Sequence, residues 1–432
     1  MNFDFIIEGN VFTNGSFHHC CIGIEDGKIV SIKKILTGAK KKTFSKQTIL
    51  PAGIDIHVHF RDPGYPSKET FTTGSTAAAY GGVSCVFDMP NTTPQTISTQ
   101  SVLSKIRNAA HTSLVDFGIY GGISDDTLPT INKLYPLVPG FKVFLGSSTN
   151  SLHFSTQHLP DLFKQLQGAS KPLLFHAEDA DCLQQHKREE HNLIDHHLAR
   201  PYTCEQKAVE TILSHAPFPC PVHVCHVSST NVLHLLQHLS SSLSFGVTPH
   251  HCLLHLHHKN LENHPSYGKV NPPLRQEEHQ TKLLHAVTKG NIPIIESDHA
   301  PHAQTEKHQS FHEAPCGISG VETMYPLFLS LAAQQKIPIQ IVINAICTRP
   351  ASLFGLSKGL IKEGYDADFI AVDMKQPKII SSDALHSKAS FSPFEGFSAI
   401  FPNDLFIRGH HVIEDSELIG KPGLGAHIIE DL

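Results

Sequence analysis

Short runs in which apolar and polar residues alternate or cluster mark both ends of the chain. The clearest runs are DFIIEGNVF (4–12), CIGIEDGKIVSIKKI (21–35), GYDADFIAVD (364–373) and DLFIRGHHVIED (404–415). The pairs Asn14-Gly15 and Asp26-Gly27 are typical of hairpin turns between strands. We therefore expect strands at both ends, and the simplest arrangement places residues 1–50 and 356–432 in one composite β-sandwich domain.

Between residues 51 and 355 the pattern changes to short β-rich runs that alternate with longer, more helical segments. The runs are ILPAGIDIHVHF (which begins just before residue 51), VSCVFDM, VDFGIY, GFKVFL, KPLLFHAE, VHVCHVS, LSFGVTPH and IPIIESDHA. A strand followed by a helix, repeated, is typical of parallel βα units. About eight units favour a closed (β/α)₈ TIM barrel, and an open doubly wound sheet is the alternative. The predicted fold class is α/β, with the barrel over residues 51–355 and a small sandwich beside it.

Composition narrows the class of protein further. The chain has 432 residues, 40% of them hydrophobic, which is enough for a barrel and a second domain. The formal net charge of −6 without a basic tract argues against a nucleic-acid partner. The N-terminus does not resemble a signal peptide, and no stretch resembles a membrane span. The ten cysteines include no CxxC pair, so we expect reduced thiols and a cytoplasmic protein without a membrane partner.

Histidine is so abundant, with 33 copies, that most of these residues must be surface or packing residues. In a TIM barrel the active site lies at the C-terminal ends of the strands, so the histidines at strand ends carry the most weight. His57 and His59 are two positions apart and therefore face the same way on a strand. Two converging imidazoles suit a metal ion, although two histidines on a polar strand face would look the same.

Four further strand-like runs carry a residue that could belong to the same centre. Lys142 lies among apolar neighbours in GFKVFLG, either as a lysine that reaches solvent or as a carbamylated lysine whose carboxylate bridges two metals. His176, His226 and Asp298 each end a run, while His223 should face away on a regular strand. An HxH pair followed by Lys, His, His and Asp predicts a metal centre at the barrel mouth.

At this point the sequence resembles the amidohydrolase superfamily and, within it, the dihydroorotase family of cyclic amidohydrolases (class I type). The likeness covers most of the chain. Its motifs are DIHVHFRDPG (55–64), DMPNT (88–92), GFKVF (140–144), HAED (176–179), HVSS (226–229), VTPHH (247–251), KVNPPLR (269–275), SDHAPH (297–302) and the GYDADF stretch. HxH alone is weak evidence, but HFRDPG followed by MPNT, NPPLR and DHAPH is specific.

The resemblance implies a centre of two Zn²⁺ ions per subunit. His57, His59 and Asp298 would hold one ion, and His176 and His226 would hold the other. Carboxylated Lys142 and a hydroxide would bridge them. Some bacterial relatives use an aspartate of another loop as the bridge, but the lysine followed by GSSTN (146–150) favours the carboxylated form here.

The resemblance also implies a substrate site. Its side chains would be Arg61, Asn91, Asn271 and His302, and a backbone contact would come from Cys316 and Gly317, where the family usually has Phe before the Gly. The implied reaction is the reversible hydrolysis of (S)-dihydroorotate to N-carbamoyl-L-aspartate, the third step of de novo pyrimidine biosynthesis. A metal-held hydroxide would attack the ring carbonyl, and Asp298 would act as general acid and base. Arg61 would bind the substrate carboxylate.

Other functions stay open on the sequence alone. Allantoinase, hydantoinase and dihydropyrimidinase share the metal centre but bind rings without the ring carboxylate of dihydroorotate. Arg61 could instead be a rim ion pair, and Asn91 could be an ordinary turn residue. A catalytically inactive dihydroorotase-like partner of aspartate transcarbamoylase is a third hypothesis, disfavoured because all six metal positions are filled. The family suggests a homodimer, with aspartate transcarbamoylase as a possible partner enzyme.

Overall fold

Both ends of the chain contribute strands to one sheet. The computed structural model describes residues 3–146, 152–237 and 242–429. The N-terminal strands are β1 (Phe5–Thr13), β2 (Ser16–Glu25), β3 (Lys28–Lys33) and β4 (Lys41–Pro51). The turn residues Asn14, Gly15, Asp26 and Gly27 all have positive φ, as the predicted hairpin turns require.

The C-terminal strands complete this composite sheet. They are β14 (Phe369–Val372), β17 (Asp404–Ile407), β18 (His410–Glu414) and β19 (Glu417–Leu418), and the strand order is β19-β18-β17-β14-β4-β1-β2-β3. The two halves meet where β14 pairs antiparallel with β4, with Ile370 opposite Leu50. A separate small ladder joins β15 (Lys378–Ile379) to β16 (Ser398–Ala399).

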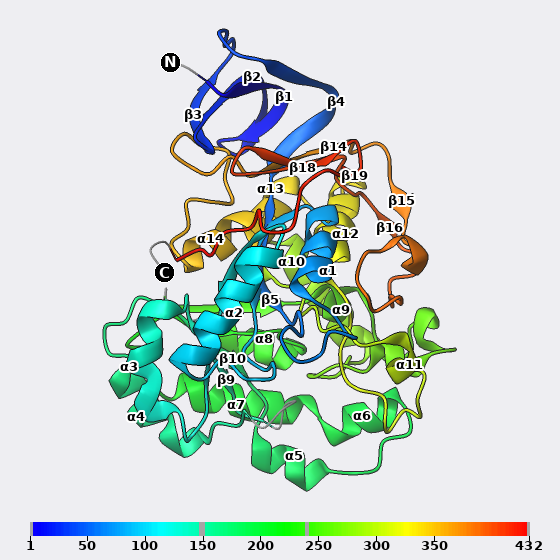
Figure 1. Ribbon diagram of the computed structural model, residues 1–432. Helices are drawn as coiled ribbons and strands as arrows, with labels where there is room; N and C mark the ends of the chain where they lie inside the picture. The colour runs from blue at the N-terminus through cyan, green and yellow to red at the C-terminus, as the bar shows by residue number, and fades with distance from the viewer. Residues whose placement is uncertain (1–2, 147–151, 238–241, 430–432) are drawn as a thin grey trace.

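The composite sheet curls, so that its two halves enclose an apolar core. Ile22 of β2 belongs to the same buried cluster as Phe369 of β14 and Phe406 of β17. The backbone of Lys28 in β3 forms an isolated antiparallel β-bridge with that of Asp366, close to the start of β14. Figure 1 shows this sheet at one end of the molecule, with α5 and α6 at the other.

Eight parallel βα units form the rest of the molecule. The strands are β5 (Gly53–Val58), β6 (Val83–Asp88), β7 (Asp116–Ile119), β8 (Gly121–Ile123), β9 (Phe141–Phe144), β10 (Leu173–His176), β11 (Val222–Val224), β12 (Leu243–Val247) and β13 (Ile294–Ile295). The third run, VDFGIY, gives β7 and continues into β8, so β7 pairs with β6 and β8 pairs with β9. A parallel bridge between Val58 and His299 joins the last unit to the first and closes the barrel. The predicted strand runs thus all lie in this barrel.

Helices cover the barrel. They are α1 (Phe71–Tyr80), α2 (Thr99–Thr112), α3 (Ile131–Leu134), α4 (Leu159–Gln165), α5 (Ala180–His186), α6 (Leu193–Ala199), α7 (Tyr202–Leu213), α8 (Thr230–Leu236), α9 (Pro249–Leu253), α10 (Glu277–Thr288), α11 (Gln304–Lys307), α12 (Val321–Ala333), α13 (Ile339–Ile343) and α14 (Arg349–Leu353). In α7 the buried residues Cys204, Ala208 and Ile212 recur every four positions and form one inward face. β6 is buried throughout and mostly apolar because both faces of the strand are covered.

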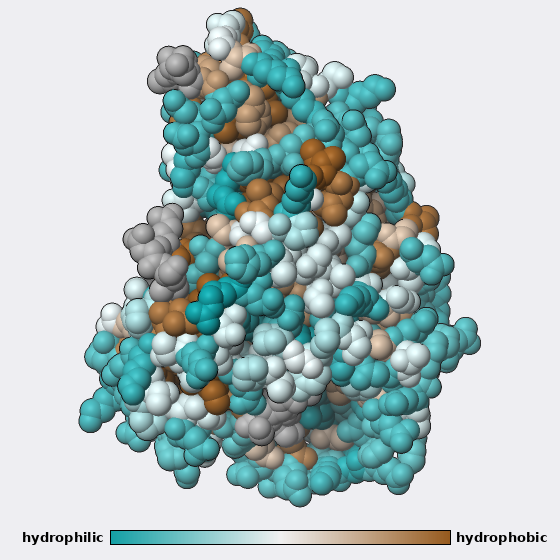
Figure 2. Space-filling model, viewed as in Figure 1, coloured by the Kyte–Doolittle hydropathy of each residue, from teal (hydrophilic) through white to brown (hydrophobic). Residues whose placement is uncertain are grey.

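The surface agrees with a molecule that keeps its apolar residues inside. Figure 2 shows hydrophilic residues over most of the visible face, with hydrophobic residues gathered near the composite sheet. In the part of the chain that the structure describes, we find no helix with both the length and the apolar character needed to cross a membrane.

The expectation that every cysteine is reduced is wrong for one pair. Cys182 of α5 and Cys204 of α7 form a disulfide, with Cα atoms 5.3 Å apart. Their separation of 22 residues matches no local motif, and only the packing of the two helices brings the sulfurs together. The remaining eight cysteines are free, and all of them except Cys316 are buried.

A buried charge network ties the barrel to the composite sheet. The Nζ atom of Lys358 lies 2.6 Å from a carboxylate oxygen of Asp116 in β7. It lies 2.8 Å from one oxygen each of Asp366 and Asp368, which precede β14. Burial alone would lower the pKa of Lys358, but Asp368, Asp116 and Asp366 raise it well above its ordinary value. The guanidinium of Arg408 adds a contact to Asp116.

This network predicts a large cost for removing its central cation. Lys358→Ala leaves three carboxylates in a buried site without their shared cation, so we expect a loss of about 3–5 kcal/mol in the free energy of unfolding. Urea unfolding followed by circular dichroism measures the change. The exposed Lys375 provides the control, because Lys375→Ala should alter stability by less than about 0.5 kcal/mol. Equal unfolding midpoints for the two variants would contradict the assignment.

Candidate metal centre and substrate site

The first group of candidate ligands gathers where β13 meets β5. His57 lies on β5 and His59 just beyond its end, and the Nε2 atom of each lies 3.3 Å from Oδ1 of Asp298. Asp298 follows β13, which neighbours β5 through the bridge that closes the barrel. The three ligand atoms lie within 4.8 Å of one another, and all three residues are buried. This is the convergence that the HxH spacing predicts.

The second group adjoins the first. His176 ends β10, and His226 follows β11 in a backbone conformation with φ 40°. Nδ1 of His176 lies 3.1 Å from Nε2 of His226. The ring centroids of His226 and His57 are 5.2 Å apart, so the two groups share one space.

Burial favours the metal-binding form of the His59 and His226 imidazoles. Burial lowers the pKa of His59 to about 3, and burial followed by the charges of His176 and Lys142 lowers that of His226 well below its ordinary value. A neutral ring has a free nitrogen lone pair, as a metal ligand must. Burial alone would raise the pKa of Asp298, but the adjacent His57 and the hydrogen bond with His59 lower it well below its ordinary value, so this residue is a carboxylate. Nitrogen and carboxylate donors of this kind fit zinc.

Two acceptor side chains fix the orientation of His59 and His176, and a third, Glu296, lies close to His57. Nδ1 of His59 lies 2.8 Å from Oδ1 of Asn91, and Nε2 of His176 lies 2.8 Å from Oε2 of Glu178. In each case the ring donates on that side and turns its other nitrogen towards the centre. Oε2 of Glu296 lies 3.5 Å from Nδ1 of His57.

Glu178 and Glu296 are functional residues that the sequence interpretation missed. Glu178 lies two positions after His176, and Glu296 two positions before Asp298, the spacing that puts side chains on one strand face. That spacing is the signal that could have revealed them. Glu296 also accounts for the orientation of His223, which was expected to face away from the site. The His223 side chain is buried, and its Nε2 atom lies 3.4 Å from Oε2 of Glu296.

Lys142 lies on β9, opposite Leu174 of β10, and its side chain is fully buried. Its Nζ atom lies 3.0 Å from Sγ of Cys225 and 5.2 Å from the centre of the Phe144 ring. Among the described residues no carboxylate lies within 4.0 Å of this nitrogen. A charged ammonium in such a place is costly, so the snorkelling interpretation does not fit. Most of the GSSTN loop (147–150) lies outside the described residues.

One cavity unites most of the residues expected at the site. Its lining residues are His57, His59, Arg61, Asn91, Phe144, His176, His226, Val270, Asn271, Asp298, Ala300, Cys316 and Gly317. Two expected residues do not line it: Lys142, which contacts the lining residue Phe144, and His302, which lies against Arg61. Their placement brings all the expected residues into one region, while their individual roles stay predictions.

Arg61 points a buried cation into this region. It has φ 62° and 6% exposure, and its Nε atom donates to the carbonyl of Pro301 at 3.3 Å. Its Nη2 atom lies 3.2 Å from Nε2 of His302, whose Nδ1 atom accepts from Lys68 at 3.1 Å. Burial lowers the pKa of His302 to about 3. The charges of Arg61 and Lys68 add to this effect, whereas the hydrogen bond with Glu306 opposes it, so this ring is neutral. Within the described ranges no carboxylate lies within 4.0 Å of Arg61.

The backbone at Cys316 and Gly317 forms another wall of the cavity. Gly317 has φ 147°, and a Cβ atom there would lie 2.2 Å from the carbonyl oxygen of Ala300, so only glycine fits. Its N–H group donates to the carbonyl of Lys269 at 2.9 Å, and its carbonyl accepts from Lys307 at 3.1 Å. The carbonyl of Cys316 accepts from His302 at 2.9 Å and can accept a second bond.

Neutral histidines and a carboxylate at the C-terminal mouth of a βα barrel define the class of metal-dependent hydrolases. The amidohydrolase family model matches residues 48–398. The chain belongs to this family and, within it, to the dihydroorotase group.

The curated relatives support this placement along nearly the whole chain. The dihydroorotase of Thermoplasma acidophilum is 40% identical over 424 residues, which cover 98% of this chain and 97% of the relative. The dihydroorotase of Methanosarcina acetivorans is 34% identical over 436 residues, covering 96% and 93%.

Solved structures of related enzymes share the fold. The L-hydantoinase (dihydropyrimidinase) of Arthrobacter aurescens superposes with a TM-score of 0.93 at 25% identity and covers 99% of both chains. The dihydropyrimidinase of Brevibacillus agri gives a TM-score of 0.88 at 23% identity and covers 98% of both chains, which supports the fold alone.

The contact between Glu178 and His176 predicts an effect on metal retention. Glu178→Gln removes the anion that holds the His176 ring, so metal affinity should fall about 10–100-fold. Equilibrium dialysis against a metal buffer, followed by elemental analysis, measures this change. Glu189→Gln makes the same chemical change at an exposed site and should leave metal content unchanged. Identical metal content in the two variants would rule out the orienting role.

Proposed function

We propose that this chain catalyses the reversible hydrolysis of (S)-dihydroorotate to N-carbamoyl-L-aspartate. The observation that carries this proposal is Arg61, a buried guanidinium that lines the same cavity as the histidines. Among the described residues, no carboxylate lies within ion-pair range of Arg61. The site therefore favours an anionic ligand as the partner of this cation. Dihydroorotate is a cyclic amide that carries such a carboxylate.

The planar fork of Arg61 suits a carboxylate geometrically as well as electrically. Its Nε atom is fixed by Pro301, and its Nη2 atom lies against His302, so the guanidinium is held in one orientation. Asn271 adds an amide whose Oδ1 atom has no hydrogen-bond partner among the described residues. An unsatisfied acceptor beside a cation fits a ring that presents both an N–H group and a carboxylate.

The donor set fits zinc, and the chain's own residues would hold it. His57, His59 and Asp298 form one group of ligands, and His176 and His226 form the other. Zinc at such a site polarises an amide carbonyl and lowers the pKa of water towards about 7. Asp298, itself one of the ligands, has a carboxylate that can accept a proton and then deliver it to the departing ring nitrogen.

Lys142 fits this centre best as a carbamate. A buried ammonium next to metal cations would repel them, whereas a carbamate is an anion that can supply oxygen ligands to both. Its formation requires the neutral amine and carbon dioxide, and the Lys142 side chain is fully buried at this place. The nearby anions Asp298 and Glu296 already compensate charge in this region, and the carbamate would add one more.

Two other functions are weighed against this proposal. Hydantoinases and dihydropyrimidinases share the fold but act on rings without a carboxylate, and such rings would leave Arg61 without a counter-ion. An inactive dihydroorotase-like subunit is disfavoured because every expected metal ligand is present and all of them except Lys142 line one cavity. Both alternatives can be tested with one substrate comparison.

Arg61→Met tests the substrate assignment. Loss of the buried charge partner should lower kcat/KM for dihydroorotate by a factor that corresponds to about 2–5 kcal/mol. Hydrolysis of the neutral ring dihydrouracil should change far less. The control is Arg107→Met at an exposed position, which should leave both substrates unaffected. A wild-type chain that prefers dihydrouracil, or equal losses on both rings, would sink the carboxylate assignment.

Lys142→Ala tests the carbamate. We expect the metal content to fall towards one ion or none and activity to disappear, because the bridging anion is missing. Added short carboxylic acids should restore part of the activity. Lys142→Arg is the matched variant, since it keeps a cation but cannot form the carbamate, and it should fail as Lys142→Ala does. Full metal content with wild-type turnover in either variant would refute the bridge.

A further inference from the structure

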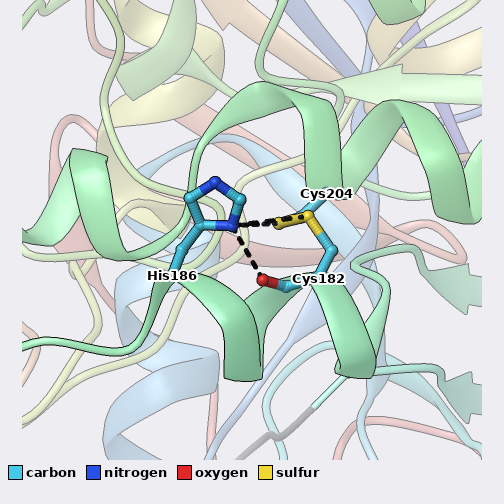
Figure 3. A group of neighbouring side chains, drawn as sticks. All are labelled: Cys182, His186 and Cys204. Carbon is cyan, nitrogen blue, oxygen red and sulfur yellow. Dashed lines mark hydrogen bonds between the residues drawn. A yellow bond between two sulfur atoms is a disulfide. The ribbon is translucent and has the colours of Figure 1, made fainter.

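A second cluster of metal-ligating side chains lies outside the barrel mouth, between α5 and α7. Cys182 and His186 are one turn apart on α5 and face Cys204 on α7 (Figure 3). Nδ1 of His186 lies 3.8 Å from Sγ of Cys182 and 4.0 Å from Sγ of Cys204. All three ligand atoms lie within 4.8 Å of one another. The cysteines are buried and the histidine is partly exposed.

The two sulfur-bearing helices are also held together by contacts other than the disulfide. Asp179, the N-cap of α5, accepts a hydrogen bond from the N–H group of Cys182 at 2.8 Å. Its own N–H group donates to the carbonyl of Cys204 at 3.0 Å. Its carboxylate also accepts from Lys207 of α7 at 2.8 Å. Cleavage of the disulfide would therefore leave two thiols side by side, next to an imidazole.

We infer that Cys182, His186 and Cys204 form a second metal site, which in the reduced chain binds a soft divalent cation of the zinc class. Two thiolates and an imidazole are ligands that zinc uses in proteins, and solvent can supply a fourth ligand on the exposed side of His186. The disulfide is the metal-free, oxidised form of the same site. This inference rests on the cluster itself and does not depend on the proposed function.

Conversion of the Cys182–Cys204 disulfide to the metal-binding form requires one external reductant. A phosphine or a dithiol supplies two electrons, and two protons complete the conversion of the disulfide to two thiols. Metal binding then releases both thiol protons. His186, which donates from Nδ1 to the carbonyl of Cys182 at 2.9 Å, must free that nitrogen, so its ring proton moves to Nε2.

The donor atoms distinguish this site from the centre at the barrel mouth. There the candidate ligands are imidazoles and carboxylates, whereas here two of three are thiolates, which select soft metals such as Cd²⁺ and Zn²⁺. Cadmium bound by thiolates has a near-ultraviolet charge-transfer absorption that nitrogen and oxygen ligands do not give. The absorption therefore reports the second site selectively.

The experiment uses the full chain with its barrel-mouth metal in place. The protein is reduced with tris(2-carboxyethyl)phosphine, desalted without oxygen and titrated with Cd²⁺. We expect the charge-transfer band to saturate at one added equivalent per chain, with two thiols protected from alkylation. The oxidised wild-type chain, identical in sequence, should show no band. A folded chain whose disulfide resists the phosphine, or a reduced chain without the band, would overturn the inference.

Variants locate the ligands. Cys182→Ser and Cys204→Ser should each abolish the band, while Cys252→Ser, at a free buried cysteine, should keep it. His186→Asn keeps both cysteines, so the disulfide can still form and the fold is the least disturbed. This variant should raise the Kd for Cd²⁺ of the reduced chain by at least about tenfold. A band of wild-type intensity in Cys182→Ser would assign the signal to another thiol and defeat the proposal.

Discussion

Burial of ionisable groups is the constraint on which the barrel mouth depends. Burial lowers the pKa of His59, His176 and His226 there, because a charge in that space is costly. Asn91 and Glu178 accept hydrogen bonds from His59 and His176, which leaves the opposite nitrogens free around Asp298 and His226. The same constraint makes Arg61 informative, since this buried cation has no carboxylate within 4.0 Å in the described part of the protein.

The sequence was sufficient for the strands because their patterns are local. Both hairpin turns follow from Asn-Gly and Asp-Gly pairs, and the barrel strands follow from short apolar runs between turn signals. The order of the composite sheet does not follow from such patterns. The parallel pairing of β1 with β4 and the contact of β14 with β4 depend on which edges meet after folding, and that depends on packing across the whole chain.

The candidate ligands were predictable because they recur at strand ends, where a barrel gathers its functional groups. The supporting carboxylates Glu178 and Glu296 were not, since an acidic residue near a strand end resembles any solvated one until its burial is known. The disulfide was missed for a related reason. Cys182 and Cys204 are separated by α6, and no spacing rule links residues on two helices that pack only in the finished fold.

The composite sheet has a consequence for how this chain is made. The hydroxyl of Thr13 donates to the carbonyl of Ile361, 348 residues further along the chain, and β4 pairs with β14 near the opposite terminus. During synthesis the first strands leave the ribosome with one edge open, and they wait until the barrel and its tail have followed. An open edge invites pairing with other chains. The edge of β4 that later pairs with β14 is thus the edge that stays open until almost the whole chain has been made.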